Sequence, residues 1–386
     1  MTARIYETDG HCRRFETVVT ACEPREGGFA VELSRTAFFP EGGGQYADTG
    51  VIDGVAVTDV QIIDEHLWHY TAAPLAVGQT VTGEIDWEQR FSRMQHHSGE
   101  HIVSGLVHAL FGLNNVGFHL GNQDTTLDFD GELTREQLMD IERRANDVVA
   151  ANQPIIVTFP TPDALSALPY RSKKELTGEI RIVTIPGVDI CACCAPHVTA
   201  TGEIGGIKLL DAMRYKGGVR VHMQCGNAAF AAFEGLYQQA SAAAAALSVK
   251  TEELAGAVDR LLAQKEELTR TAAALRRELA AKEAAMLPEG ELLCARFLPE
   301  ADSATLQALV NAAVEKQNRI GAAFAGSDTN GWVGVIGSET VEMNALATAL
   351  RTRLNGRGGG RDTRWQGRIA ASQTAITAVL TELAEG

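Results

Sequence analysis

The sequence predicts an α+β protein with four successive parts: a small N-terminal β-barrel, an α+β domain, a long helical or coiled-coil segment and a C-terminal α/β domain. Three observations support this prediction. Short β-branched runs broken by Gly, Asp and Pro fill the first part. Apolar residues then recur at helical spacing among further strands, and a leucine heptad precedes the last strands. The boundaries are placed at 1–88, 89–228, 229–287 and 288–386.

Composition restricts the class of protein before any motif is considered. A chain of 386 residues is long enough for two or three domains. Its seven cysteines are odd in number and clustered, so they suit a reducing compartment better than a disulfide framework. No apolar stretch approaches a membrane span, and we expect a cytoplasmic protein without membrane contact. The net charge of −15 means that an RNA contact would need a local basic patch.

A triple glycine interrupts the strands of the predicted barrel. It lies in TAFFPEGGGQYADTG, residues Thr36 to Gly50, and comprises Gly42, Gly43 and Gly44. Glycine adopts backbone conformations that other residues avoid, and it allows the backbone to approach a ligand closely. No Lys-Ser/Thr pair follows, so the segment is not a phosphate-binding P-loop. The residues alone leave two interpretations open, a tight hairpin and a ligand-binding turn.

Two short pairs of metal-ligating residues make the strongest chemical prediction. His97 and His101 lie in HHSGEH, and Cys193 and His197 lie in CCAPH, each pair with i, i+4 spacing. On a helix this spacing places two side chains on one face. Three imidazoles and one thiolate suit tetrahedral Zn²⁺, which binds such ligands at about 2.0–2.3 Å. We therefore predict one zinc ion per chain, provided that the fold brings the two pairs together.

Neither pair is sufficient alone. The chain has ten histidines, and free cysteines are often buried as small apolar side chains. The ring of His96 would point away from the face that His97 and His101 share. Gly99 precedes Glu100, so the motif is not the H-E-x-x-H of a metalloprotease. On a helix Glu100 would point about 100° away from its neighbour, and no general base is nominated.

The zinc-containing domain is expected to alternate helices and strands. The first helix, within 92–112, would carry both histidines of the first pair in its first turns. Thr134 is the expected N-cap of the second helix. The remaining elements follow in order: a strand hairpin over 114–130, the amphipathic helix over 133–154, a strand over 178–190 that leads to Cys193, and further strands over 202–226.

The helical segment carries a leucine at every seventh position. The leucines are Leu247, Leu254, Leu261, Leu268 and Leu275, and Val258 and Leu279 occupy two alternate core positions. This spacing predicts a coiled coil, although Lys265 and Ala272 at other core positions weaken it. We expect a homodimer through this segment. Pairing of two helices within one chain is the alternative.

An arginine-rich stretch near the C-terminus predicts RNA contact in an otherwise acidic chain. Six arginines surround three glycines and one tryptophan: Arg351, Arg353, Arg357, Arg361, Arg364 and Arg368 around Gly358, Gly359, Gly360 and Trp365. Guanidinium groups bind phosphates in a bidentate manner, and an exposed indole can stack on a base. The predicted contacts are Arg357, the turn of glycines, Arg361 and Trp365. A solvated basic loop is the alternative.

Taken together, these motifs resemble the freestanding alanyl-tRNA editing proteins in their long form, which are related to the editing and C-terminal DHHA1-type domains of alanyl-tRNA synthetase. The resemblance covers nearly the whole chain. It rests on FFPEGGGQYADTG, HSGEH, GFHLG followed by TLDFD, CCAPH, TGEIGGIKLL and the GGG of the last domain. The family usually has CGGTH at the second metal pair, so this chain keeps Cys193 and His197 and changes the three residues between them.

The resemblance implies hydrolysis of mischarged tRNA(Ala) at the zinc site, with the seryl form as first substrate and the glycyl form as second. The partner would be tRNA(Ala), bound through its aminoacylated acceptor end. The family threonine that matches Thr36 is linked to serine discrimination, and Gln45 is a second polar candidate. An editing site should form a hydrogen bond with the serine hydroxyl, which an alanyl ester lacks. Two alternatives remain, a non-catalytic zinc-containing tRNA-binding or adaptor protein and a zinc hydrolase for another aminoacyl ester.

Overall fold

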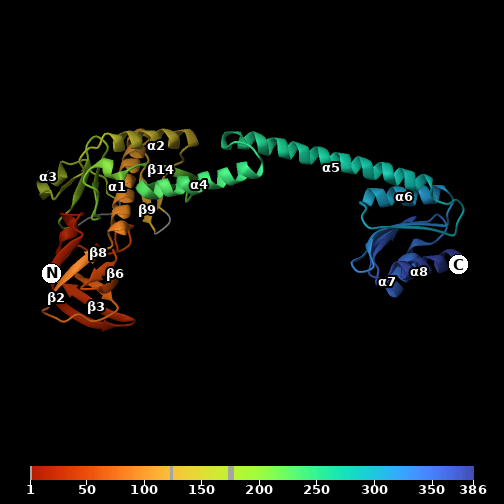
Figure 1. The fold of residues 1–386 in the computed structure, drawn as a ribbon, viewed down its shortest axis with the longest axis horizontal. Coiled ribbons are helices and arrows are strands. Elements are labelled where there is room, and N and C mark those ends of the chain that lie inside the picture. The colour runs from red at the N-terminus through yellow and green to blue at the C-terminus, as the bar shows by residue number, and fades with distance from the viewer. Residues whose placement is uncertain (1, 122–124, 173–177) are drawn as a thin grey trace. The chain divides into compact units, whose positions relative to one another are not determined.

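The computed structural model describes residues 2–121, 125–172 and 178–386, and its mixed α+β character confirms the predicted fold class (Figure 1). The chain divides into two units, Met1–Ala242 and Ala243–Gly386. The predicted boundary at 228 falls near the start of helix α4, Gly226–Ala246, whereas the two units divide inside this helix. In the described residues, no helix combines the length and apolarity needed to cross a bilayer.

The N-terminal part of the first unit is a closed barrel in the strand order β2-β3-β7-β6-β5-β8, with every neighbouring pair antiparallel. Side chains alternate along the strands, so Phe15, Thr17 and Val19 of β2 point inward and their neighbours outward. The strands are β2 Arg14–Arg25, β3 Gly28–Leu33, β5 Gly50–Ile52, β6 Val55–Ile63, β7 His66–Thr71 and β8 Thr80–Ile85. The short strands β1 Ala3–Arg4 and β4 Arg35–Thr36 pair in parallel beside it.

Helix α1, Trp87–Phe111, follows the barrel and organises the rest of this unit. Asp86 caps its N-terminus by accepting a hydrogen bond from the backbone of Gln89, and Gly112 ends it with a φ of 68°. The helix therefore begins five residues earlier than the predicted 92–112 range. His97 and His101 consequently lie in its middle, and the prediction that they occupy its first turns is wrong.

Two sheets and a second helix pack around α1. The four-stranded sheet has the order β14-β15-β10-β9, and the three-stranded sheet has the order β11-β12-β13. Their shared core is apolar and includes Ile102, Leu127, Ile141 and Val221. The elements are β9 Asn115–Leu120, β10 Thr125–Phe129, α2 Arg135–Ala150, β11 Ile156–Thr158, α3 Pro162–Ser166, β12 Ile182–Ile185, β13 Asp189–Ala192, β14 Ile207–Tyr215 and β15 Gly218–Cys225.

Local sequence signals account for most of these elements. The hairpin of β9 and β10 is confirmed, while residues 122–124 of its connection lie outside the described residues. Thr134 forms a capping box with Gln137, which confirms the predicted start of α2. The single strand expected over 178–190 is wrong, because Gly187 adopts a φ of 74° and turns the chain between β12 and β13.

A fully buried arginine joins α1 to the glycine-rich segment. The guanidinium of Arg90 binds the carboxylate of Asp48, and it also donates to the carbonyl of Gly10 at 3.0 Å. A further hydrogen bond reaches the carbonyl of Ala37. Asp48 in turn accepts from the backbone N–H of Phe39 at 2.6 Å. This network holds the segment before Gly42 against α1, the helix that carries His97 and His101.

The second unit contains a long helix and a five-stranded sheet. The helix α5, Leu254–Ala285, packs near its end on α6, and the sheet order is β16-β17-β18-β20-β19. The predicted strands in LCARFL and WVGVIG are confirmed as β16 and β18. The elements are β16 Leu293–Leu298, α6 Ser303–Glu315, β17 Ile320–Ser327, β18 Gly331–Gly337, α7 Met343–Leu354, β19 Arg357–Arg361, β20 Arg364–Ile369 and α8 Gln373–Glu385.

The leucine stripe of α5 faces solvent. Leu261, Leu268 and Leu275 are 51%, 69% and 60% exposed, respectively. The alternative in which these leucines pair with another helix of the same unit is therefore not realised in the described residues. A homodimer through the stripe stays a prediction.

Candidate metal centre

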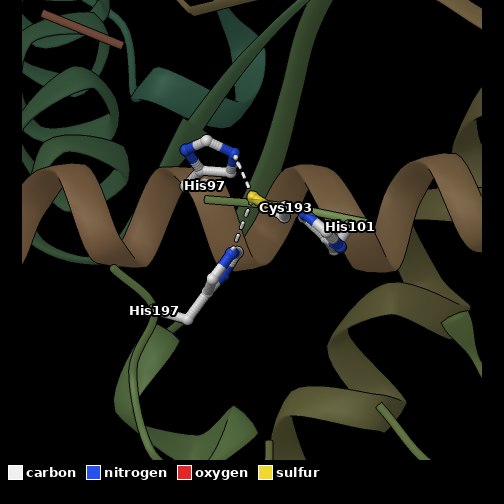
Figure 2. A group of neighbouring side chains, drawn as sticks. All are labelled: His97, His101, Cys193 and His197. Carbon is white, nitrogen blue, oxygen red and sulfur yellow. Dashed lines mark hydrogen bonds between the residues drawn. The ribbon is translucent and has the colours of Figure 1, made fainter. Parts of the chain in front are cut away.

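The four predicted ligands meet at one point of the first unit (Figure 2). One nitrogen from each of His97, His101 and His197 and the sulfur of Cys193 all lie within 4.8 Å of one another. The first two residues share a face of α1, as their spacing predicts. The second pair lies in a loop that follows β13 and not on a helix, so the turn of this loop brings its two ligands together.

Two distances within the cluster fit a tetrahedral metal. The sulfur of Cys193 is 3.4 Å from Nε2 of His97 and 3.3 Å from Nε2 of His197. A tetrahedral ion with ligands at about 2.0–2.3 Å holds neighbouring ligand atoms about 3.3–3.6 Å apart. All four side chains are largely buried, which restricts competition from water. The described residues can therefore hold a metal ion with only small adjustments.

Each histidine of the cluster uses its Nδ1 atom for a partner outside the cluster. The pairs are His97 with Oε1 of Gln45 at 2.9 Å, His101 with Oδ2 of Asp189 at 2.9 Å, and His197 with Oγ of Ser98 at 3.0 Å. An oxygen that only accepts fixes the proton on Nδ1, so the lone pair of Nε2 is directed to the centre of the cluster. Gln45 and Asp189 therefore orient two ligands for metal binding.

The electrostatics of the cluster favour the metal-binding protonation state at Cys193 and His197 and oppose it at His101. Burial raises the pKa of the Cys193 thiol, but His97 and His197 beside it outweigh this effect and bring the pKa well below the usual value. Burial lowers the pKa of His197 to about 3. A thiolate and a neutral imidazole are the forms that bind metal. Burial lowers the pKa of His101, but Cys191, Asp189 and Cys193 outweigh this effect and bring the pKa well above the usual value. A metal would therefore displace a proton from this ring when it binds.

A cavity of about 720 Å³ opens onto the cluster. Three of the four ligands line it, and so do the glycines Gly43 and Gly44. The buried carboxylate of Glu100 also faces it, while Arg4 and Arg181 contribute positive charge. Its volume is typical of sites for small ligands. A larger hollow of about 870 Å³ along the first half of α1 is lined by none of the four ligands.

The triple glycine is both a tight turn and a wall of this cavity. Gly43 and Gly44 have φ values of 62° and 83°, and Gly42 pairs with Gln45 across the turn. A Cβ at Gly44 would lie 2.3 Å from the carbonyl oxygen of Phe118. The two interpretations of this segment are therefore compatible, because the hairpin itself forms part of the wall.

We expect Gly44→Ala to lower the free energy of unfolding by about 1–3 kcal/mol, since alanine would meet both a left-handed φ and a backbone clash. Gly54→Ala is the matched control. Gly54 has a φ of 80° but no atom within 4 Å of an added Cβ. Urea denaturation of both variants separates the two effects. Equal losses would contradict a role for the close approach to Phe118.

The buried side chain of Thr36 reaches His69 of the barrel strand β7 and does not line the cavity. Its hydroxyl is 2.8 Å from Nε2 of His69, and its oxygen accepts from the backbone N–H of Phe38 at 3.1 Å. Nδ1 of His69 lies 3.0 Å from the carbonyl of Val31, and burial lowers the pKa of this histidine to about 4. The neutral ring of His69 therefore donates from Nδ1 to the carbonyl of Val31, and its Nε2 accepts a hydrogen bond from the hydroxyl of Thr36. The predicted hydrogen bond from Thr36 to a substrate hydroxyl is not part of this arrangement.

Gln45 has a clearer relation to the cluster. It is buried, its Oε1 accepts from His97, and its Nε2 has no hydrogen-bond partner in the described part of the chain. The sequence identified this residue as polar and close to the glycines but did not show that it orients a ligand. Ser98 and Asp189 were missed altogether. Ser98 lies inside the first ligand motif and Asp189 lies just before the second, and this proximity was the available signal for their roles.

The C-terminal RNA hypothesis is changed by the structure. Trp365 is 1% exposed and packs in the core of the second unit, so the prediction that it stacks on a base is wrong. The glycines 358–360 belong to strand β19 and not to a turn. At Gly358 a Cβ would lie 2.8 Å from the Trp365 ring, which gives this glycine a packing role. Arg357 and Arg361 are exposed, and their contact with RNA stays a prediction.

Comparisons with known proteins agree with these features. Residues 180–222 match the threonyl and alanyl tRNA synthetase second additional domain. The alanyl-tRNA editing protein Aarsd1 of Danio rerio is 30% identical over 291 residues, which are 71% of each chain. The Rattus norvegicus protein of the same name is 28% identical over 387 residues, 95% of this chain and 94% of its own. The Mus musculus protein is 33% identical over 231 residues, 55% of this chain and 56% of its own.

Proposed function

The chain belongs to the family of alanyl-tRNA editing proteins, and from this premise we propose that it hydrolyses mischarged tRNA(Ala), with Ser-tRNA(Ala) as first substrate and Gly-tRNA(Ala) as second. Water would cleave the ester between the amino acid and the terminal ribose, which releases the free amino acid and intact tRNA. The observation that supports this proposal most strongly is the cluster of three histidines and one cysteine at the wall of a cavity.

The proposed cofactor is one Zn²⁺ per chain, held by His97, His101, Cys193 and His197. Nitrogen and sulfur donors in a closed set of four favour zinc over magnesium or calcium, which take oxygen ligands. When bound, zinc would supply a Lewis acid that polarises an ester carbonyl or acidifies a water molecule. All seven cysteines are free thiols, which is consistent with a reducing compartment, and we place the protein in the cytoplasm.

The residues around the cluster would keep this site in its binding geometry. Gln45 and Asp189 hold the rings of two ligands. Arg181 donates to the backbone carbonyl of Cys193 at 2.8 Å and to that of Ala195 at 2.9 Å. Arg181 therefore fixes the loop that carries the thiolate. The chain thus supplies a preorganised donor set and a wall of small residues against which the aminoacyl end of the tRNA can lie.

Thr36 would influence serine selectivity through position and not through direct contact. We expect Thr36→Val to retain zinc but to narrow the preference for Ser-tRNA(Ala) over Ala-tRNA(Ala), because the hydroxyl that holds the Phe38 backbone before the glycine turn is removed. The measurement is the ratio of kcat/KM for the two substrates. Thr71→Val is the matched control, since the hydroxyl of this buried barrel threonine donates to the carbonyl of Ala73 in its own loop at 2.9 Å. An unchanged ratio in Thr36→Val would show that Thr36 does not influence serine selectivity.

The proposed partner is tRNA(Ala), with its acceptor end in the cavity. Arg357 and Arg361 are exposed on strand β19, and Gly358 and Gly359 beside them are exposed too. Guanidinium groups that are exposed on a strand can bind the phosphates of an RNA backbone. We therefore propose this strand as an additional tRNA contact of the second unit.

The proposed oligomer is a homodimer through α5. We expect Leu268→Glu to convert the dimer to a monomer, because a charge would then lie in the middle of the exposed leucine stripe. Light scattering at micromolar concentration measures the change. Ala263→Glu places the same charge on the opposite side of the helix and should leave the dimer intact. A wild-type protein that is monomeric at this concentration would contradict the proposal.

The proposed activity is tested by release of labelled serine from Ser-tRNA(Ala), with Ala-tRNA(Ala) as the control substrate. Hydrolysis that favours the seryl ester supports editing. Bound zinc without hydrolysis of either ester would favour the non-catalytic tRNA-binding alternative. Hydrolysis of small aminoacyl esters without dependence on the tRNA would favour a different zinc hydrolase.

A further inference from the structure

The cavity at the metal cluster extends from buried ligands to the protein surface. His97 and His101 line its buried part and are 3% and 2% exposed. Val116 and Phe159 line the same cavity and are 65% and 38% exposed. The volume of about 720 Å³ is typical of sites for drug-sized ligands, and a seryl or glycyl group is far smaller than such a ligand. The cavity therefore has room for the aminoacyl group and for the end of the tRNA that carries it.

The ring of Phe159 is held in place by the chain on both sides. Phe159 directly follows β11, and all three residues of this strand pair with β12. Pro160 comes next, and the residue before a proline is restricted to extended conformations. Thr161 then caps α3, since its hydroxyl accepts from the backbone N–H of Ala164 at 3.4 Å. Phe159 thus offers an aromatic surface whose ordering costs little when a ligand binds.

This exposed ring suits a planar base better than it suits the acyl group or a phosphate. Seryl and glycyl groups carry no large apolar surface that the ring could cover. A phosphate would need a cation, but Arg4 of the cavity wall pairs with Glu7 at 3.2 Å, and Arg181 donates to backbone carbonyls. Every nucleic-acid base has a face that stacks on an aromatic side chain. The terminal base of the tRNA is joined to the ester through a single ribose, so an ester at the cluster brings this base close by.

We propose that Phe159 stacks on the base of the terminal adenosine, an inference that rests on the proposed deacylase function and names how that site holds the end of its substrate. The other phenylalanine of the cavity wall, Phe118, packs on the ligand His97 with ring centroids 4.8 Å apart. The contact with Phe159 is common to seryl, glycyl and alanyl esters, so it does not select serine. It binds the end of the tRNA and orients the ester toward the metal cluster.

The test compares two seryl esters that differ only in the terminal base. One is Ser-tRNA(Ala), and the other is the same tRNA with a hydrogen in place of the terminal adenine. Both are made by ligation of a chemically acylated dinucleotide to tRNA(Ala) that lacks its last two nucleotides. Phe159→Ala in the complete chain should lower kcat/KM for the normal ester about five- to a hundredfold, which corresponds to the loss of one base–aromatic stack. Hydrolysis of the ester without the base should stay within about twofold.

Two further variants separate stacking from a general effect on the segment. Phe159→Tyr keeps an aromatic face at the same position, so kcat/KM for both esters should stay within about threefold of the wild type. Ile156→Ala is the matched control, because Ile156 is 43% exposed on β11 and is not among the described residues that line the cavity. It should leave the ratio between the two esters unchanged. Metal content is measured for every variant, so that loss of the cluster is recognised directly.

The outcomes separate the inference from the function on which it rests. Equal loss of both esters in Phe159→Ala, or equal losses in Phe159→Ala and Phe159→Tyr, would overturn the inference. Equal hydrolysis of the two esters by the wild-type protein would also overturn it and leave the proposed function intact. No hydrolysis of Ser-tRNA(Ala) by the wild-type protein would overturn the proposed function itself, and the inference with it. A loss that is confined to the ester with the base and absent from Phe159→Tyr would establish Phe159 as the base-stacking residue.

Discussion

Cys193→Ala is expected to lose bound metal and to reduce deacylation of Ser-tRNA(Ala) by more than about a hundredfold. Cys193 provides the sulfur of the cluster, and it lies 3.4 and 3.3 Å from two of the three ligand nitrogens. Loss of a partner outside the ligand set alone typically costs about 10–100-fold in metal affinity or activity. Loss of a direct ligand should cost more. Metal content and single-turnover hydrolysis, measured on the same preparation, record both effects.

The adjacent cysteine provides the matched control. Cys194 also lines the cavity, but it does not belong to the ligand cluster. Its side chain is exposed, and its sulfur is not among the four ligand atoms that lie within 4.8 Å of one another. Cys194→Ala should therefore keep the metal and most of the activity. Full metal content in Cys193→Ala, or equal losses in the two variants, would contradict the assignment of the cluster.

Arg90→Met is expected to lower the free energy that protects α1 from opening by about 3–5 kcal/mol, since removal of one partner of a buried ion pair leaves the other charge largely uncompensated. Arg93 also pairs with Asp48, but only at 3.9 Å. Arg90 is 0% exposed and Asp48 is 1% exposed. Methionine fills much of the arginine volume but cannot donate to Asp48, Gly10 or Ala37. Hydrogen exchange of the α1 backbone amides in the complete chain measures the change.

An exposed arginine separates this effect from a general loss of charge. Arg143 lies on α2 and pairs with Asp140 and Asp147, and its side chain is 62% exposed. Solvent screens such pairs, so Arg143→Met should change the same protection by less than about 1 kcal/mol. A comparably small effect of Arg90→Met would show that the buried network does not hold the glycine-rich segment against α1.

The ligand set could be predicted from sequence because metal chemistry restricts both residue type and spacing. His97 and His101 need only a helix to share a face, and this helix is visible in the periodicity of its apolar residues. Cys193 and His197 could be identified by composition, but the loop that joins them is set by the β12–β13 hairpin and by Arg181. Such long-range hydrogen bonds have no local signal.

The errors have equally specific causes. The arginines around Trp365 predict an RNA contact, yet strand alternation turns the tryptophan side chain into the core, while the side chains of Arg364 and Gln366 are partly or fully exposed. Thr36 precedes the glycine turn and matches the family threonine, and together these features predict a contact with the substrate. Its burial depends on closure of the barrel around His69, which the segment itself does not specify. Sequence patterns place residues on elements, whereas packing decides which faces remain open.

Stepwise zinc loading of metal-free protein tests whether the four-residue cluster supports deacylation. Bound zinc per chain and hydrolysis of Ser-tRNA(Ala) are measured at each step, with Ala-tRNA(Ala) beside it. We predict that serine-selective hydrolysis rises in proportion to bound zinc and reaches its plateau at one ion per chain. A fully loaded protein that hydrolyses neither ester, or metal-free protein that hydrolyses the seryl ester at the full rate, would contradict the account.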